Sequence, residues 1–212
     1  MKKSIDSLLA QLGNIPFEVS VLKSLLSRHR APQESVLYLE RQGKIVRLKR
    51  GLYVVNPEIS HLPYAEFLIA NHLYGPSYVS MYAALRYYGL IPERVNLVDS
   101  MTTGRSREYR NEVGVFRYTT CRHDYYSVGT HMESSSDGGF VIAGPEKALC
   151  DLIVSTANLN LRYMNETLAY LEEDMRIDLD HVREMDASVF RECLPYCKKK
   201  AMIENIIKFI KE

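Results

Sequence analysis

The spacing of apolar residues in the first quarter of the chain predicts three short helices followed by two strands. Helices are expected at residues 5–12, with Ser4 as the N-cap, at residues 17–27, and from Pro32 to the segment before Gly43. The run from Ile45 to Val55 indicates two strands joined by a tight basic turn at residues 49–51. This order of elements is typical of a winged helix-turn-helix domain, here residues 1–57.

The third predicted helix has few apolar residues. Val36 and Leu39 are its expected core positions, and Leu37 or Tyr38 would complete the apolar stripe. Glutamine and arginine side chains can bond the edges of bases in a bidentate way, so the outward face is predicted to read DNA bases through Gln33, Ser35, Tyr38 and Arg41. Phosphates are expected to contact the basic residues before the helix and along the hairpin, namely Arg28, Arg30, Lys44, Arg47, Lys49 and Arg50.

The remainder of the chain predicts a mixed α+β effector domain over residues 58–157 and a helical tail over residues 158–212 that packs on it. Helices are expected at 64–74, at 78–88 after a Ser77 cap, and at 145–157; strands are expected at 95–103, 113–119, 123–129 and 139–143. In the tail, helical patterns cover 163–173, 187–193 and 198–211. The predicted class is therefore α+β, with a winged helix at the N-terminus.

The distribution of charge favours DNA as a partner of the first module. Residues 1–55 hold ten Lys and Arg against four Asp and Glu, a net of +6, whereas residues 56–212 hold seventeen against twenty-two, a net of −5. Neutralisation of phosphates supplies most of the sequence-independent affinity for DNA, so a basic module on a mildly acidic body suits a DNA-binding protein. The alternative is that these basic residues form an ordinary solvated surface.

Other classes find less support in the composition. No apolar run reaches the roughly 18 to 20 residues of a membrane span, and no secretory leader is evident, so a cytoplasmic location is expected. The cysteines at 121, 150, 193 and 197 are scattered, which favours reduced thiols, and the six histidines are not spaced as ligands. We therefore expect no metal, no cofactor and no enzymatic activity.

Three segments of the middle region occur together in the order known from one family. They are residues 77–93 (SYVSMYAALRYYGLIPE), residues 102–107 (TTGRSR) and residues 142–152 (IAGPEKALCDL), preceded by RLKRGLY at 47–53. The chain resembles the AbiEi family, antitoxins of type IV toxin–antitoxin systems in phage defence, over roughly residues 5–155. The resemblance implies a repressor that binds inverted repeats in its own promoter. It also implies an effector domain that counters a nucleotidyltransferase-like toxin without a stable complex.

The second domain offers a candidate effector surface, and two other functions remain open. A group of arginines with tyrosines interleaved could contact nucleic acid or the partner system: Arg105, Arg107, Arg110 and Arg117. The alternative for them is a solvated hairpin. Lys147 near a helix start could belong to the same surface, and the alternative for it is a helix-capping pair. A plain transcription factor with a ligand-sensing or dimerisation domain is the second function. A metal-dependent nuclease using Asp137, Glu146 and Lys147 is the third, although the last two diverge by about 100° on a helix. The oligomeric state is open.

Overall fold

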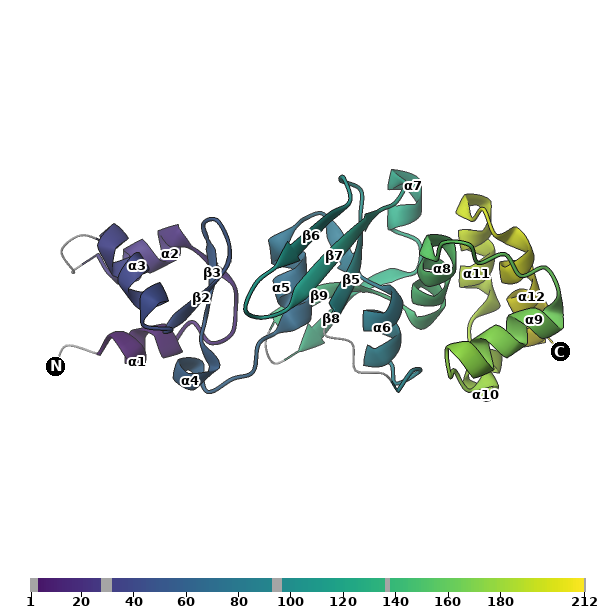
Figure 1. The fold of residues 1–212 in the computed structure, drawn as a ribbon, viewed down its shortest axis with the longest axis horizontal. Coiled ribbons are helices and arrows are strands. Elements are labelled where there is room, and N and C mark those ends of the chain that lie inside the picture. The colour runs from purple at the N-terminus through teal and green to yellow at the C-terminus, as the bar shows by residue number, and fades with distance from the viewer. Residues whose placement is uncertain (1–3, 28–31, 93–96, 136–137, 212) are drawn as a thin grey trace.

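The computed structural model describes residues 4–27, 32–92, 97–135 and 138–211, without the side chains of residues 32–34 and 135. Three parts follow one another along the long axis of the molecule: an N-terminal unit, a central sheet with its helices, and a C-terminal group of helices (Figure 1). The chain is thus a mixed α+β protein with a helical C-terminal part. Within the described ranges, no helix has both the length and the apolar character that crossing a membrane would need.

The N-terminal unit packs three helices against a three-stranded antiparallel sheet. The helices are α1 (Ile5–Ala10), α2 (Val19–Leu25) and α3 (Pro32–Arg41); the strands are β1 (Phe17–Glu18), β2 (Ile45–Lys49) and β3 (Leu52–Val55), in the order β1-β3-β2. Ser4 caps α1 as expected, because its side chain accepts a hydrogen bond from the Ser7 amide. The second helix begins two residues later than predicted, since Phe17 pairs with Tyr53 in the sheet. Apolar residues from all three helices and the strands form a separate small core.

The central sheet has six strands in the order β6-β7-β5-β4-β9-β8. These are β4 (Ser77–Val79), β5 (Leu97–Thr102), β6 (Arg107–Arg110), β7 (Val115–Thr120), β8 (Thr130–Ser135) and β9 (Gly138–Ala143). Helix α5 (Glu66–Leu73) covers one face, where the Tyr118 hydroxyl donates to the Ala70 carbonyl at 2.6 Å. Helices α6 (Met81–Tyr87) and α8 (Pro145–Ser155) pack on each other at the other face. Short helices α4 (Pro57–Ser60) and α7 (His123–Tyr126) lie in the connections.

Two predictions of local structure in this region were wrong. The helix expected to start after Ser77 begins only at Met81, because residues 77–79 form the central strand β4, paired with β5 and β9. Tyr78 and Val79 are fully buried there, so tertiary packing overrides the helical spacing. The strand expected over 123–129 is instead helix α7 followed by a turn.

The C-terminal helices extend the central core rather than forming a core of their own. They are α9 (Met164–Ala169) with a π-helical turn (Tyr170–Asp174), α10 (Leu179–Arg183), α11 (Ala187–Cys193) with a 3₁₀ turn (Leu194–Tyr196), and α12 (Lys200–Lys211). Helix α11 packs on α8, and α12 packs on α9, α10 and α11. One continuous cluster of buried apolar residues joins them to the sheet. Helix α10 was not among the predicted pieces.

The β2–β3 hairpin belongs to both cores. Ile45, Tyr53 and Val55 face the N-terminal core, whereas the other face of the hairpin joins the large central core through Val46, Leu48, Leu52 and Val54. The two sets alternate along the strands because neighbouring side chains of a strand point to opposite faces. The hairpin therefore connects the N-terminal unit to the rest of the protein as a packed element.

Candidate nucleic-acid interface

The outward face of α3 is the first part of the candidate site. Val36 and Leu39 are buried in the N-terminal core, as the sequence predicts. Neither Leu37 nor Tyr38 completes the apolar stripe, because their exposed fractions are 54% and 57%. Arg41 is also exposed at the end of the helix. The outward face thus presents one aliphatic, one phenolic and one guanidinium group to solvent. Val36 and Leu39 anchor the opposite face of the helix in the core.

The other two predicted base-reading residues are not shown at the surface in the same way. Ser35 is half-buried; it is the first residue of α3 whose side chain the structure describes. Gln33 lies within the backbone of α3, but its side chain falls outside the described part of the chain. Tyr38 and Arg41 are accordingly the predicted base-reading side chains that the structure places at the surface.

Of the basic residues along the hairpin, Arg47 lies against α3. The Arg47 side chain is 48% exposed, and its guanidinium lies 3.9 Å from the carboxylate of Glu40 on α3. Arg50 is exposed at the turn between β2 and β3, where it lines the same hollow as Lys49 and His72 of α5. Lys44 forms an ion pair with Asp6 of α1 at 2.5 Å and remains partly exposed. The predicted phosphate contacts Arg28 and Arg30 lie outside the described residues.

Lys49 is engaged elsewhere, which corrects its predicted role as a phosphate contact. Its Nζ donates to the Leu73 carbonyl at 2.6 Å and lies 3.4 Å from the His72 carbonyl, both at the C-terminal end of α5. The last carbonyls of a helix carry partial negative charge and attract cations. Asn111, in the turn between β6 and β7 of the central sheet, donates from its side chain to the Leu48 carbonyl at 3.1 Å. Both bonds fasten the hairpin to the central domain.

A signal for this attachment was present in the sequence. All four residues of β3, Leu52 to Val55, are apolar and buried. A strand with one solvated face alternates apolar and polar side chains, whereas a continuous apolar run is typical of a strand covered on both faces. A wing open to solvent would have shown that alternation.

The predicted effector arginines do not form one patch. On β6 and β7, Glu108 pairs with Arg117 in register while Arg107 pairs with Tyr118, so the pleat separates them to opposite faces. Arg107 lies over the Tyr74 ring at 5.3 Å. On the other face, Arg110 and Arg117 both contact Glu108, at 2.7 and 3.3 Å. Arg105 is exposed in the preceding connection. Most of this positive charge is therefore already matched by tyrosine rings and acids.

Lys147 is fully buried, which corrects its assignment to an effector surface. Its Nζ lies 3.3 Å from Asp151 Oδ1 and donates to the Tyr125 carbonyl at 3.1 Å. Ser80 donates to the second oxygen of Asp151 at 2.6 Å. Ser80 comes from the segment SYVS, and Lys147 and Asp151 come from PEKALCD, so these two segments meet in the interior. Their observed contacts hold α6, α7 and α8 together.

Of the three residues considered for a nuclease, the two that the structure describes have other contacts. Glu146 accepts a hydrogen bond from the Asp186 amide at 3.0 Å, and Lys147 points into the core. Asp137 lies outside the described residues. All four cysteines are free thiols, and Cys150, Cys193 and Cys197 are buried.

Comparison with known proteins informs the fold only. No protein-family model matches the chain, and no curated protein matches it. Among solved structures, the chain is similar to the crystal structure of the RV2827C protein from Mycobacterium tuberculosis, with a TM-score of 0.56 and 12% sequence identity. The match covers 97% of this chain and 80% of that one. The arrangement of all three parts is therefore shared with a natural protein of very different sequence.

Proposed function

We propose that the protein is a DNA-binding transcriptional repressor and that its N-terminal unit acts as a winged helix-turn-helix. The observation that carries this proposal is the outward face of α3, where Tyr38 and Arg41 are exposed on a helix anchored by Val36 and Leu39. A helix that buries two residues and turns hydrogen-bonding side chains outward suits insertion into the major groove. Arg47, which lies against Glu40 of the same helix, and Arg50, exposed at the hairpin turn, would contact the phosphates.

The structure also supports a particular form of the winged helix. The order of three helices and a two-stranded hairpin fits the motif, and Figure 1 shows α3 at the side of the N-terminal unit away from the central sheet. The hairpin is packed on both faces, so its contribution to DNA binding would come from exposed arginines rather than from insertion of the whole hairpin. The net charge of +6 over residues 1–55 would supply the attraction to DNA.

We further propose that the repressor is the antitoxin of a type IV toxin–antitoxin system and represses its own promoter at inverted repeats. The support is the resemblance of residues 77–93, 102–107 and 142–152 to AbiEi antitoxins. The functional partner would be a nucleotidyltransferase-like toxin. A plain transcription factor lacks this second activity, so the two functions separate experimentally.

Arg41→Ala is expected to weaken binding to the promoter by about 1 to 3 kcal/mol and to relax the preference at one base position. Arg47→Ala should instead weaken binding to all sequences alike and reduce the salt dependence by about one phosphate contact. Fluorescence anisotropy with the upstream DNA and a scrambled duplex, over a range of salt, measures both effects. Arg162→Ala, an exposed arginine of the C-terminal part, is the matched control. Equal losses on both duplexes for Arg41→Ala would refute the base-reading assignment.

Antitoxin activity is expected to survive loss of DNA binding. The full-length chain carrying Arg41→Ala and Arg47→Ala should rescue growth of cells that express a nucleotidyltransferase-like toxin from the neighbouring gene, because the effector region is unchanged. The measurement is colony formation, compared with cells that express the toxin alone. Failure of the unmodified chain to rescue growth, with promoter binding intact, would leave the plain transcription factor as the function.

A further inference from the structure

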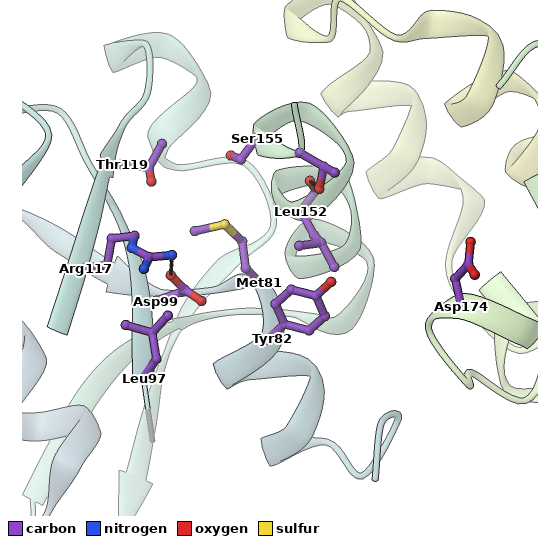
Figure 2. Close-up of a pocket in the computed structure, with 10 residues that line it drawn as sticks. Met81, Tyr82, Leu97, Asp99, Arg117, Thr119, Leu152, Ser155 and Asp174 are labelled. Atoms are coloured by element: carbon purple, nitrogen blue, oxygen red, sulfur yellow. Dashed lines mark hydrogen bonds and ion pairs between the residues drawn. The ribbon is translucent and has the colours of Figure 1, made fainter. Parts of the chain in front are cut away.

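A cavity of about 610 Å³ lies between the central sheet and the C-terminal helices, outside the candidate DNA interface. Strands β5 and β7 form its floor, helices α6 and α8 form its sides, and the π-helical turn before α10 contributes Asp174 (Figure 2). Its apolar walls are Met81, Leu97 and Leu152, joined by the ring of Tyr82. A volume of roughly 300 to 1,000 Å³ with apolar walls and few polar groups is typical of small-molecule sites.

Asp99 is the buried charged group of this cavity. It lines the floor on β5 and is only 5% exposed. Its partner Arg117 approaches from β7, but the closest atoms, Arg117 Nη1 and Asp99 Oδ1, are 3.8 Å apart, which is too long for a hydrogen bond (Figure 2). Arg117 is itself half exposed and shared with Glu108 at 3.3 Å. The Asp99 carboxylate therefore retains acceptor capacity on the side of the cavity.

The surrounding charges favour a cation. Among the lining residues that the structure describes, Arg117 is positive and Asp99 and Asp174 are negative, and Glu108 also pairs with Arg117. A ligand that brings N–H donors to Asp99 would supply the hydrogen bonds that Arg117 does not make. Such charge-assisted bonds are stronger than neutral ones, and a planar N–H fork matches both oxygens of a carboxylate. An anionic ligand would meet two acids and one shared arginine.

We propose that this cavity binds a small organic cation, an amidinium or amine with an apolar body, whose N–H groups pair with Asp99. Leu97, Leu152 and Met81 contact the apolar body, and Asp174 lies at the rim toward the C-terminal helices. The site is built from the second and third parts of the chain. It is therefore independent of whether α3 binds DNA.

Three probes of the same shape test the charge preference. Benzamidine is a planar cation with N–H donors, benzamide is its neutral counterpart, and benzoate is its anionic counterpart. Each is titrated into the full chain without DNA, with binding followed by calorimetry and by ligand-observed NMR. Benzamidine should bind at least about tenfold more tightly than benzamide, because the charge-assisted pair is lost in the neutral probe. Benzoate binding as tightly as benzamidine, or no benzamidine binding at millimolar concentration, would overturn the proposal.

Variants then locate the binding. Asp99→Asn keeps the shape of the side chain and should weaken benzamidine by about tenfold or more, whereas Asp174→Asn, at the exposed rim, should change it less than about threefold. Ser155→Trp adds a large ring at an exposed lining position and should block the cavity without altering the core. Benzamidine affinity that survives both Asp99→Asn and Ser155→Trp would place the ligand elsewhere. Promoter binding measured on the same variants keeps this outcome separate from that of the DNA proposal.

Discussion

Replacing Asp151 with alanine is expected to lower the free energy of unfolding by about 3 to 5 kcal/mol. The substitution leaves Lys147 fully buried without the carboxylate that lies 3.3 Å from its Nζ, and it removes the acceptor of the Ser80 hydroxyl. A buried charge without its partner carries its full desolvation cost, which is why breaking such a pair costs more than replacing both members. Urea unfolding of the full chain, followed by circular dichroism, measures the loss.

The double variant Lys147→Met with Asp151→Ala is the matched control for this prediction. Methionine fills much of the lysine volume without a charge, so the double variant should be more stable than Asp151→Ala alone. A double variant as unstable as the sum of the two single variants would mean that the pair contributes no interaction. In that case the loss in Asp151→Ala would come from packing and from the lost hydrogen bond of the Ser80 hydroxyl.

The loss in Asp151→Ala should also depend on pH. Burial lowers the pKa of Lys147, and the attraction of Asp151 opposes this shift. Without Asp151 the pKa falls further, so the native state binds fewer protons than the unfolded state below the ordinary lysine range. Stability then rises with pH, because it does so wherever the unfolded state binds more protons. The free energy of unfolding of the variant should therefore fall short of that of the unmodified protein by more at pH 6 than at pH 9.

The sequence predicted those parts of the fold in which local pattern and tertiary packing agree. Helix α3 starts at Pro32 and buries Val36 and Leu39, because proline suits a first helical turn and the two apolar residues lie on one side. The helix predicted from Pro145 is α8, again with proline in the first turn. Strands β2 and β3 were predicted from their apolar runs and from Gly51, which adopts a φ of +84° in the turn.

The errors arise where a long-range contact decides the structure. Residues 77–79 lie between β5 and β9. Their partners on β5 are 21 to 25 residues further along the chain, and Val79 pairs with Ile142 on β9, 63 residues further, so no local window contains either contact. Residues 123–126 are rich in tyrosine, which suits a strand, yet the Tyr125 ring packs on Lys147 and Tyr196 in the core. A short segment with one buried aromatic residue satisfies this packing equally well as a helical turn.

The candidate site was predictable at α3 and not at the hairpin or the cavity. Exposure of Arg41 follows from helical spacing, whereas the same spacing left open whether Leu37 or Tyr38 would be buried, and both are exposed. The bond from Lys49 to the Leu73 carbonyl requires knowledge of where α5 ends. Asp99 falls within the predicted strand 95–103, and its residue type and position alone do not indicate burial. Its burial between β4 and β7 depends on the order of strands in the sheet.

The packed hairpin has a consequence for the proposed repressor. Apolar residues on one face of the hairpin lie in the central core, and Lys49 and Asn111 add hydrogen bonds across the same boundary. The N-terminal unit is thus connected to the central domain by a rigid element as well as by the chain. The orientation of α3 relative to the body is set by packing, so the spacing of two such proteins on inverted repeats would be fixed by the same contacts.

Asp99→Asn is expected to stabilise the protein by up to about 3 kcal/mol at pH 7. Burial raises the pKa of the Asp99 carboxyl to about 6; Arg117 opposes the shift and Glu108 adds to it. The native state therefore binds more protons than the unfolded state between the ordinary aspartate pKa of 3.8 and about 6. Stability falls as pH rises through this window, because the unfolded state then binds fewer protons. Asparagine has the same shape and never carries the charge.

The difference in unfolding free energy between Asp99→Asn and the unmodified protein should accordingly be small at pH 4 and largest at pH 7. Taking the difference cancels the titration of groups common to both proteins, so urea unfolding at four pH values between 4 and 7 isolates Asp99. Asp174→Asn removes an exposed acid of the same cavity, so its free energy of unfolding should stay within about 0.5 kcal/mol of the unmodified protein at every pH. A difference that shrinks as the pH rises would show that Arg117 compensates Asp99 fully. A buried carboxylate that destabilises the free protein is consistent with a binding site for a cation, because a bound cationic ligand would offset the cost of burying the charge.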